Sequence, residues 1–422
     1  MSYRRGAART YWVETLGCPK NDVDSHKLAG TLEADGMRRA ESATEADIVV
    51  VNTCAFIEEA RKESIERVLA LADAKRDGAE LVVTGCMAER YGDELAQALP
   101  EVDRVAGFGV PVTLSTKTTV PKLDLLNLPR PRSAAPWAYV KIAEGCDRSC
   151  GFCAIPTFRG KQRSRSPQAI LHEVDELGDG VKEIVLVAQD LASYGKDDPS
   201  LGAGSIVPLI ESVAARVART RLLYLYPSDL SDALIDVIGS ATNVPYFDLS
   251  LQHVSKPLLR RMRRWGDGDR FRARIDDIRD RYPDAAFRSN FIVGYPGETE
   301  ADHDQLLDFV ARAQLDWVGF FAYSEEEGTY AAQLDATTKV APKLMHERLR
   351  ELTELQDEIT AKRRQQLVGL RTTVLVDRPG IARSHREAPE IDGIITVPDT
   401  FAAGAFHDVT ITATSGVDLE AA

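Results

Sequence analysis

The sequence predicts a multidomain α/β protein with an N-terminal doubly wound parallel α/β domain, a central partial (βα)6 TIM-like barrel and a C-terminal small antiparallel β-barrel. Strands and helices alternate over residues 10–110 and again from 137 to about 341, as is typical of parallel sheets. After residue 368, short β-branched runs separated by turns are typical of a small antiparallel barrel. We therefore expect domains at 8–125, 137–366 and 367–422, with a linker at 126–136 that is rich in Pro and Arg.

In the N-terminal domain, each of three predicted strands leads into a cysteine. The strands are expected at 11–17, 47–53 and 80–85, and helices at 24–35, 58–76 and 89–99. The cysteines are Cys18, Cys54 and Cys86. Ligands bind at the carboxyl edge of a parallel sheet, so three thiols at this edge can meet at one point. One such cysteine alone would more often be a buried core residue, but three at equivalent positions predict an iron–sulfur cluster.

The central barrel is predicted from six strand–helix units. Its strands are expected at 138–143, 183–188, 221–226, 246–251, 287–293 and 317–323, and its helices at 167–177, 206–217, 231–238, 258–264, 270–281 and 300–313. A long charged helix at 343–367 is expected to lead to the last domain. In such barrels the chemistry is located at the carboxyl ends of the strands.

The loop after the first barrel strand carries Cys146, Cys150 and Cys153 in a C-x3-C-x2-C spacing. Three thiolates can hold three irons of a cubane 4Fe–4S cluster and leave the fourth iron open for a small molecule. The alternatives are three unrelated loop cysteines or a zinc knuckle. Zinc usually takes four protein ligands, and no fourth Cys or His lies close in the sequence. The motif therefore favours the cluster.

Other candidate residues follow the remaining barrel strands. Gln189, Gln252 and Glu298 occupy such positions, but each can equally be a loop or helix-capping residue. His253 can be a structural, hydrogen-bonding histidine. The segment 158–165 after the cysteine motif is basic and includes Arg159; its alternative interpretation is a solvated loop.

Composition and charge limit the class of protein. The 422 residues are 44% hydrophobic, which supplies ample material for cores. Their formal net charge of −13 argues against a broad nucleic-acid-binding surface. The last domain holds four arginines and eight acidic residues and better suits a basic protein surface. Six cysteines in two groups of three do not form the framework of a small secreted domain. No N-terminal apolar segment and no run of ~18 apolar residues is present, so we expect a cytoplasmic protein with no membrane partner.

Several of these motifs resemble the motifs of a known family. The C-x3-C-x2-C motif, with Phe152 before its last cysteine, resembles the radical S-adenosylmethionine signature. The runs AIPTFRG at 154–160, SLQHVS at 250–255 and IVGYPGET at 292–299 look like the methylthiotransferase branch of that superfamily, although Ser250 stands where the family commonly has Pro. The three N-terminal cysteines and a TRAM-like barrel complete this architecture, so the resemblance covers nearly the whole chain.

Within the branch, LGCPKN at 16–21 is similar to the RimO type, which modifies an aspartate of ribosomal protein uS12. The tRNA-modifying MiaB type usually has Gln-Met after that cysteine, and APEIDG at 388–393 also looks RimO-like. The resemblance implies a methylthiotransferase that inserts a methylthio group at the β-carbon of the aspartate. The alternatives are a tRNA adenosine 2-methylthiotransferase, favoured by the basic run 260–264, and a non-catalytic Fe–S redox sensor.

The resemblance also implies cofactors, partners and roles. The cofactors are two 4Fe–4S clusters and S-adenosylmethionine. The cysteines Cys146, Cys150 and Cys153 would be the catalytic set that holds the radical-generating cluster, and Cys18, Cys54 and Cys86 would hold the second. A 5′-deoxyadenosyl radical would abstract hydrogen from the aspartate, chemistry that a protein delegates to a cofactor. Candidate contacts to S-adenosylmethionine are Phe152, Gln189, Gln252, Glu298 and Arg159. The implied partners are uS12 as substrate, an electron donor such as flavodoxin or ferredoxin, and a possible sulfur carrier.

Overall fold

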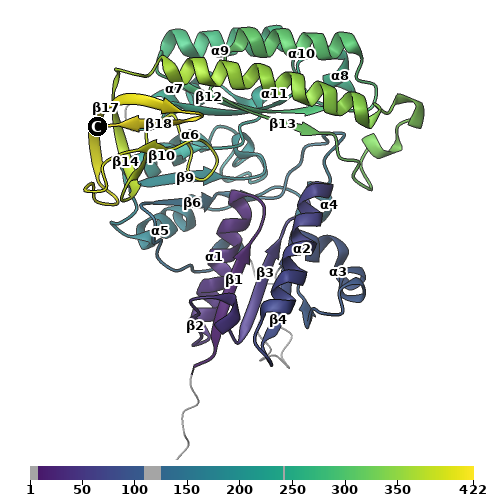
Figure 1. The fold of residues 1–422 in the computed structure, drawn as a ribbon, viewed down its shortest axis with the longest axis vertical. Coiled ribbons are helices and arrows are strands. Elements are labelled where there is room, and N and C mark those ends of the chain that lie inside the picture. Colours follow the sequence, from purple (N-terminus) through teal and green to yellow (C-terminus); the bar gives the residue numbers. More distant parts are fainter. Residues whose placement is uncertain (1–7, 109–124, 241–242) are drawn as a thin grey trace, which may run out of the picture. The chain divides into compact units, whose positions relative to one another are not determined.

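The computed structural model describes residues 8–108, 125–240 and 243–422, so that 109–124 of the predicted N-terminal domain lie outside the described residues (Figure 1). The chain forms two compact units. The N-terminal unit comprises the chain up to Arg132 together with Glu144–Cys146 and Ala154–Lys161. The C-terminal unit comprises Ser133–Ala143, Asp147–Cys153 and Gln162–Ala422. The segment that follows Cys153 therefore folds with the N-terminal unit.

The N-terminal unit contains a five-stranded parallel sheet in the order β2-β1-β3-β4-β5. Its strands are β1 (Thr10–Thr15), β2 (Arg38–Arg39), β3 (Ile48–Thr53), β4 (Glu80–Gly85) and β5 (Arg104–Val105), and its main helices are α1 (Pro19–Ala34), α2 (Glu58–Ala74) and α3 (Cys86–Ala98). All six residues of β3 are buried, as expected for a strand covered on both faces. Val49 and Val51 pack into one core and Ile48 and Val50 into another, which confirms the doubly wound architecture.

Two helices of this unit begin earlier than the sequence predicts. Helix α1 starts at Pro19 rather than residue 24, because proline at the first helical position is pre-organised for a helix. Helix α3 starts at Cys86 rather than residue 89. The short helix α4 (Ile155–Arg159) extends into the basic segment 158–165, for which a solvated loop is the alternative interpretation from sequence, and Phe158 is buried in the same core as Val51.

The C-terminal unit contains six parallel strands: β6 (Trp137–Lys141), β9 (Glu183–Val187), β10 (Arg219–Leu222), β11 (Tyr246–Gln252), β12 (Ala286–Val293) and β13 (Trp317–Ala322). They form two three-stranded sheets, β10-β9-β6 and β11-β12-β13, that are joined by a single parallel bridge between Leu225 and Leu249. Strand β10 ends earlier than predicted, and Tyr224 just beyond it has a φ of 67°. This left-handed conformation is costly for a bulky residue and does not continue a strand. The predicted partial (βα)6 barrel is confirmed.

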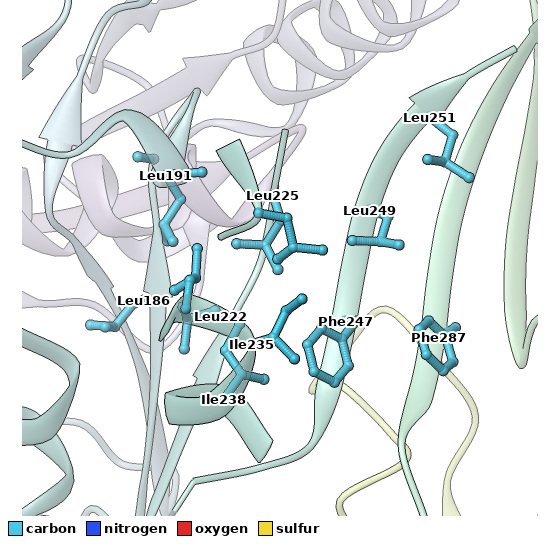
Figure 2. Packing of buried hydrophobic residues seen from close by; sticks show 14 of the residues in the cluster. Leu186, Leu191, Leu222, Leu225, Ile235, Ile238, Phe247, Leu249, Leu251 and Phe287 are labelled. Carbon is cyan, nitrogen blue, oxygen red and sulfur yellow. The ribbon is translucent and has the colours of Figure 1, made fainter. Parts of the chain in front are cut away.

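Helices alternate with these strands and enclose the barrel core. They are α5 (Pro167–Leu177), α6 (Ile206–Ala214), α7 (Asp232–Gly239), α8 (Lys256–Arg261), α9 (Gly268–Arg281), α10 (Glu300–Ala313) and α11 (Pro342–Gln365), and two short strands, β7 (Ala143–Glu144) and β8 (Arg163–Ser164), lie near the cysteine motif in the sequence. Figure 2 shows how Leu222 and Leu225, Ile235 of α7 and Phe247 of β11 gather in one apolar cluster. This packing supports the strands at whose carboxyl ends the candidate site lies.

The last residues form a closed barrel in the order β14-β15-β16-β18-β17. The strands are β14 (Arg371–Arg378), β15 (Ile381–Arg383), β16 (Ile395–Thr396), β17 (Phe406–Ser415) and β18 (Asp418–Ala421). Their shared core includes Val374, Val376 and Ile411. The pairing of β16 with β18 is parallel and differs from the otherwise antiparallel ladder. Among the described residues, no helix has both the length and the apolarity needed to cross a membrane.

Candidate active site

The three N-terminal cysteines lie at the carboxyl edge of the parallel sheet. Cys18 precedes helix α1, Cys54 follows β3, and Cys86 follows β4 as the first residue of α3. Strands β1, β3 and β4 are neighbours in register, which places the three chain ends side by side. Gly17, with a φ of 101°, allows the approach: a Cβ there would lie only 3.0 Å from the Cys54 Sγ. The fold thus gathers three thiols that are far apart in the sequence.

Two of these thiols are buried, and cations lie beside the group. Cys54 and Cys86 are each 7% exposed. Burial raises the pKa of Cys54 to about 12 and also raises the pKa of Cys86. At Cys18 burial acts in the same direction, but the charges of Lys20 and Arg159 outweigh it and lower the pKa. Arg159 also lowers the pKa of Cys54 and Cys86, but by less than burial raises it, so only at Cys18 do the cations prevail and favour the thiolate, the form that binds iron.

Arg159 is the cation at the centre of this group. Its Nη2 donates to the Cys86 Sγ over 3.0 Å and to the Asn21 Oδ1 over 2.7 Å. Its Nη1 donates to the Asp24 Oδ2 over 2.8 Å and to the Glu144 carboxylate over 3.1 Å. The sequence predicted Arg159 as a contact to S-adenosylmethionine, and the structure places it beside the N-terminal thiols.

The donor set is of the kind that an iron–sulfur cluster uses. In a cubane cluster each thiolate binds a different iron, so three thiols can hold three of the four irons. Three thiols with a guanidinium donor to one sulfur provide both the ligands and the outer hydrogen bond that such groups use.

The C-x3-C-x2-C motif follows β6 and β7. In the N-terminal unit, the Cys146 N–H donates to the Gly160 carbonyl over 3.1 Å. In the C-terminal unit, the Cys153 N–H donates to the Cys150 carbonyl over 3.2 Å and forms a turn. Arg264, which follows α8, donates to the Cys150 Sγ over 3.3 Å. The thiol of Cys150 therefore also has a guanidinium partner, as suits an anionic iron ligand.

Arg148 lies inside the cysteine motif and anchors it to the barrel. Its Nε donates to Asp190 over 2.6 Å, and its guanidinium also forms an ion pair with Asp229. Asp190 follows β9 and Asp229 lies beyond β10, so one side chain ties the motif to the carboxyl ends of two strands. The guanidinium stacks 3.9 Å from the Tyr226 ring. Sequence reasoning missed this role, although the position of Arg148 between two motif cysteines was a usable signal.

The remaining predicted contacts to S-adenosylmethionine differ in their surroundings. Gln189 follows β9 and Gln252 ends β11, with a φ of 71°, so both lie at the carboxyl edge of the barrel. Phe152 is half-buried against the barrel core. Glu298 is buried, accepts from the Gly294 N–H and forms an ion pair with Arg348 of α11 over 3.1 Å. Its carboxylate is thus engaged by protein groups, and burial raises its pKa.

Comparisons with known families agree with this organisation. Residues 10–107 match Uncharacterized protein family UPF0004, residues 140–310 match the Radical SAM superfamily, and residues 368–422 match the TRAM domain. In solved structures, the chain is similar to the radical S-adenosylmethionine methyltransferase TsrM from Kitasatospora setae, with a TM-score of 0.51 and 14% identity over 82% of this chain and 89% of that chain. At this identity the likeness shows the fold alone.

Several curated relatives share nearly the full length of the chain. Ribosomal protein uS12 methylthiotransferase RimO of Cutibacterium acnes is 42% identical, covering 98% of this chain and 97% of its own length. Proteins of the same name from Streptomyces coelicolor and Myxococcus xanthus are each 40% identical over 98% of this chain, covering 96% and 91% of their own lengths. The similarity therefore spans all three matched regions.

Proposed function

The chain belongs to the RimO family of ribosomal protein uS12 methylthiotransferases, and we propose that it transfers a methylthio group to the β-carbon of an aspartate of uS12. It is a radical S-adenosylmethionine enzyme that uses S-adenosylmethionine and an iron–sulfur cluster. The observation that carries the proposal is the triplet of thiols at the edge of the N-terminal sheet. Radical generation needs only the C-x3-C-x2-C motif, so a second gathered triplet indicates a second task, the supply of sulfur.

The two triplets have separate roles in this proposal. Cys146, Cys150 and Cys153 hold the radical-generating cluster, and Cys18, Cys54 and Cys86 hold a second 4Fe–4S cluster. When bound, the clusters and S-adenosylmethionine supply the hydrogen-abstracting radical and the methylated sulfur. The protein's own side chains fix the ligands and exclude water. Arg148 and Arg264 hold the motif in place, and the burial of Cys54 and Cys86 keeps the second set dry.

The charge of the molecule supports a protein substrate. Ribosomal proteins are usually basic, and an acidic enzyme with an acidic C-terminal barrel attracts them. Of the basic run 260–264 that favours tRNA, Arg264 is buried and engaged with Cys150. Flavodoxin or ferredoxin is proposed as electron donor, and a sulfur carrier as a further partner, with the reaction in the cytoplasm.

Mass spectrometry of uS12 and of tRNA from a strain that lacks this protein tests the substrate. We expect the uS12 aspartate to lose its methylthio group while tRNA modification persists. Loss of the group from tRNA alone would replace the proposal with the tRNA-modifying alternative, and no loss from either would favour a redox sensor.

Cys54→Ala tests the division of labour between the two triplets. After anaerobic reconstitution, the wild-type chain is expected to hold about eight irons and the variant about four. We expect the variant to cleave S-adenosylmethionine but not to transfer sulfur. About four irons in the wild-type chain would reject the second cluster, and loss of cleavage in the variant would show that the roles are not separable.

A further inference from the structure

Arg159 is a buried cation in contact with one of the three N-terminal thiols. Its side chain is 3% exposed, and its partner Asp24 is 2% exposed. A buried guanidinium is tolerated only when its donors are paired, because removing it from water is costly. Here two carboxylates and an amide oxygen supply partners, and the Cys86 sulfur accepts a further hydrogen bond from Nη2.

The geometry of these partners fixes the direction of the guanidinium. Asp24 and Glu144 both accept hydrogen bonds from Nη1, so the two carboxylates fix this end of the planar guanidinium. The other arm, Nη2, is left to reach Asn21 and Cys86. The face of the guanidinium lies 4.3 Å from the centre of the Phe108 ring. Lysine lacks this fork and could not reproduce both sets of contacts from one position.

The backbone that carries Arg159 is also held firmly. Arg159 is the last residue of α4, and Ala154 and Phe158 on the same segment are buried in the core beside Val51 and Val83. The carbonyl of the next residue, Gly160, accepts from the Cys146 N–H. The side chain therefore projects from a packed element and not from a solvated loop.

We propose that Arg159 is a positioning residue for the second cluster, which holds the Cys86 sulfur in place and stabilises the negative charge of the reduced cluster. This inference rests on the proposed second cluster. Outer hydrogen bonds to ligand sulfurs raise the reduction potential of iron–sulfur clusters and strengthen metal retention. A positive donor at 3.0 Å from the sulfur acts in that direction.

The test isolates the second cluster in the full-length chain. The variant Cys146→Ala/Cys150→Ala/Cys153→Ala removes the first cluster, and Arg159→Gln is introduced into this background. Two properties are measured: the midpoint potential by redox titration followed by electron paramagnetic resonance, and the rate of iron loss to a chelator. Arg76→Gln is the matched control, since Arg76 pairs with Asp47 at the opposite, amino end of β3.

We expect Arg159→Gln to lose iron ~10-fold faster or more, in line with the effect of other outer-shell substitutions. The reduction equilibrium should shift about tenfold towards the oxidised form, which is 59 mV for a one-electron couple. Arg159→Lys should restore part of the potential because the charge remains. Arg76→Gln should change neither property. An unchanged potential and iron retention in Arg159→Gln would overturn the inference.

Two further outcomes separate the inference from its premise and from misfolding. If the triple cysteine variant binds no cluster, the second cluster itself is rejected and the role of Arg159 with it. If Arg159→Gln does not fold because Asp24 loses its buried ion pair with Arg159, Arg159→Gln/Asp24→Asn removes that charge. A cluster of normal potential and stability in this folded double variant would equally overturn the inference.

Discussion

His253 illustrates at the residue scale how burial determines the behaviour of a titratable group. The ring is fully buried and its Nδ1 accepts from the Ser255 N–H over 3.1 Å, which supports the structural interpretation over a catalytic one. Burial lowers its pKa to about 3; Asp302 opposes this shift, and His303 and Arg348 add to it.

This histidine gives a pH-dependent stability. Its pKa is about 6.5 in an unfolded chain, so below that value the unfolded state binds more protons than the folded one. The stabilisation is complete above pH 6.5 and is lost as the pH falls towards about 3. Between pH 7.5 and 5, the free energy of unfolding should fall by about 2 kcal/mol less in His253→Asn than in the wild type.

Anaerobic urea titrations at several pH values measure this difference. His172→Asn is the control, because its side chain is 74% exposed. Equal pH dependence in wild type and His253→Asn would show that His253 titrates normally in the folded protein.

At the scale of elements, the C-terminal barrel is joined to the central barrel by buried ion pairs. Glu183 of β9 forms ion pairs with Arg221 of β10 over 2.6 Å and with Arg383 of β15 over 3.0 Å. Arg364 of α11 forms a further buried pair with Glu387, which follows β15. Burial would raise the pKa of Glu183, but the two arginines outweigh it and lower the pKa to about 2. The carboxylate is therefore charged in the folded enzyme.

Glu183→Gln should leave two arginines without their shared carboxylate. Arg383 keeps its ion pair with Asp377, so the arginine that loses its ion pair is Arg221. Breaking a buried ion pair from one side costs about 3–5 kcal/mol, since the remaining charge is buried and uncompensated. The midpoint of urea unfolding of the C-terminal unit, followed by tryptophan fluorescence, measures the loss. Glu211→Gln on the exposed face of α6 should change stability little. A loss in Glu183→Gln no larger than in this control would mean that the pairs add no net stability.

The same elements show what the sequence can predict. Hydrophobic periodicity located most strands within a few residues, and the order strand–cysteine at 18, 54 and 86 predicted where the thiols lie, because parallel strands share one carboxyl edge. The contact between Arg159 and Cys86 joins residues 73 positions apart, and no local pattern encodes it. A basic segment looks solvated in sequence, and only tertiary packing shows that α4 is folded into a core. The ion pairs of Glu183 could not be predicted from the sequence either, because they also join residues that are far apart in the chain.

At the scale of the whole molecule, charge connects the fold to the choice of substrate. The net charge is −13, and exposed carboxylates of the C-terminal barrel include Asp399, Asp408 and Glu420. Long-range attraction between an acidic surface and a basic protein raises the association rate and is screened by salt. Buried ion pairs join this barrel to the central barrel within the C-terminal unit, so its carboxylates belong to the same compact unit.

We therefore expect Asp399→Asn/Asp408→Asn/Glu420→Gln to slow association with uS12 several-fold at low ionic strength. The difference from wild type should shrink as salt is added, because salt screens the electrostatic attraction that these carboxylates contribute. Stopped-flow binding of purified uS12 at increasing salt measures this effect. The control removes three exposed carboxylates from α2 by Glu59→Gln/Glu63→Gln/Glu66→Gln and changes the net charge equally. Equal slowing in both variants would assign the attraction to overall charge, and no slowing in either would show that uS12 is recognised without electrostatic steering.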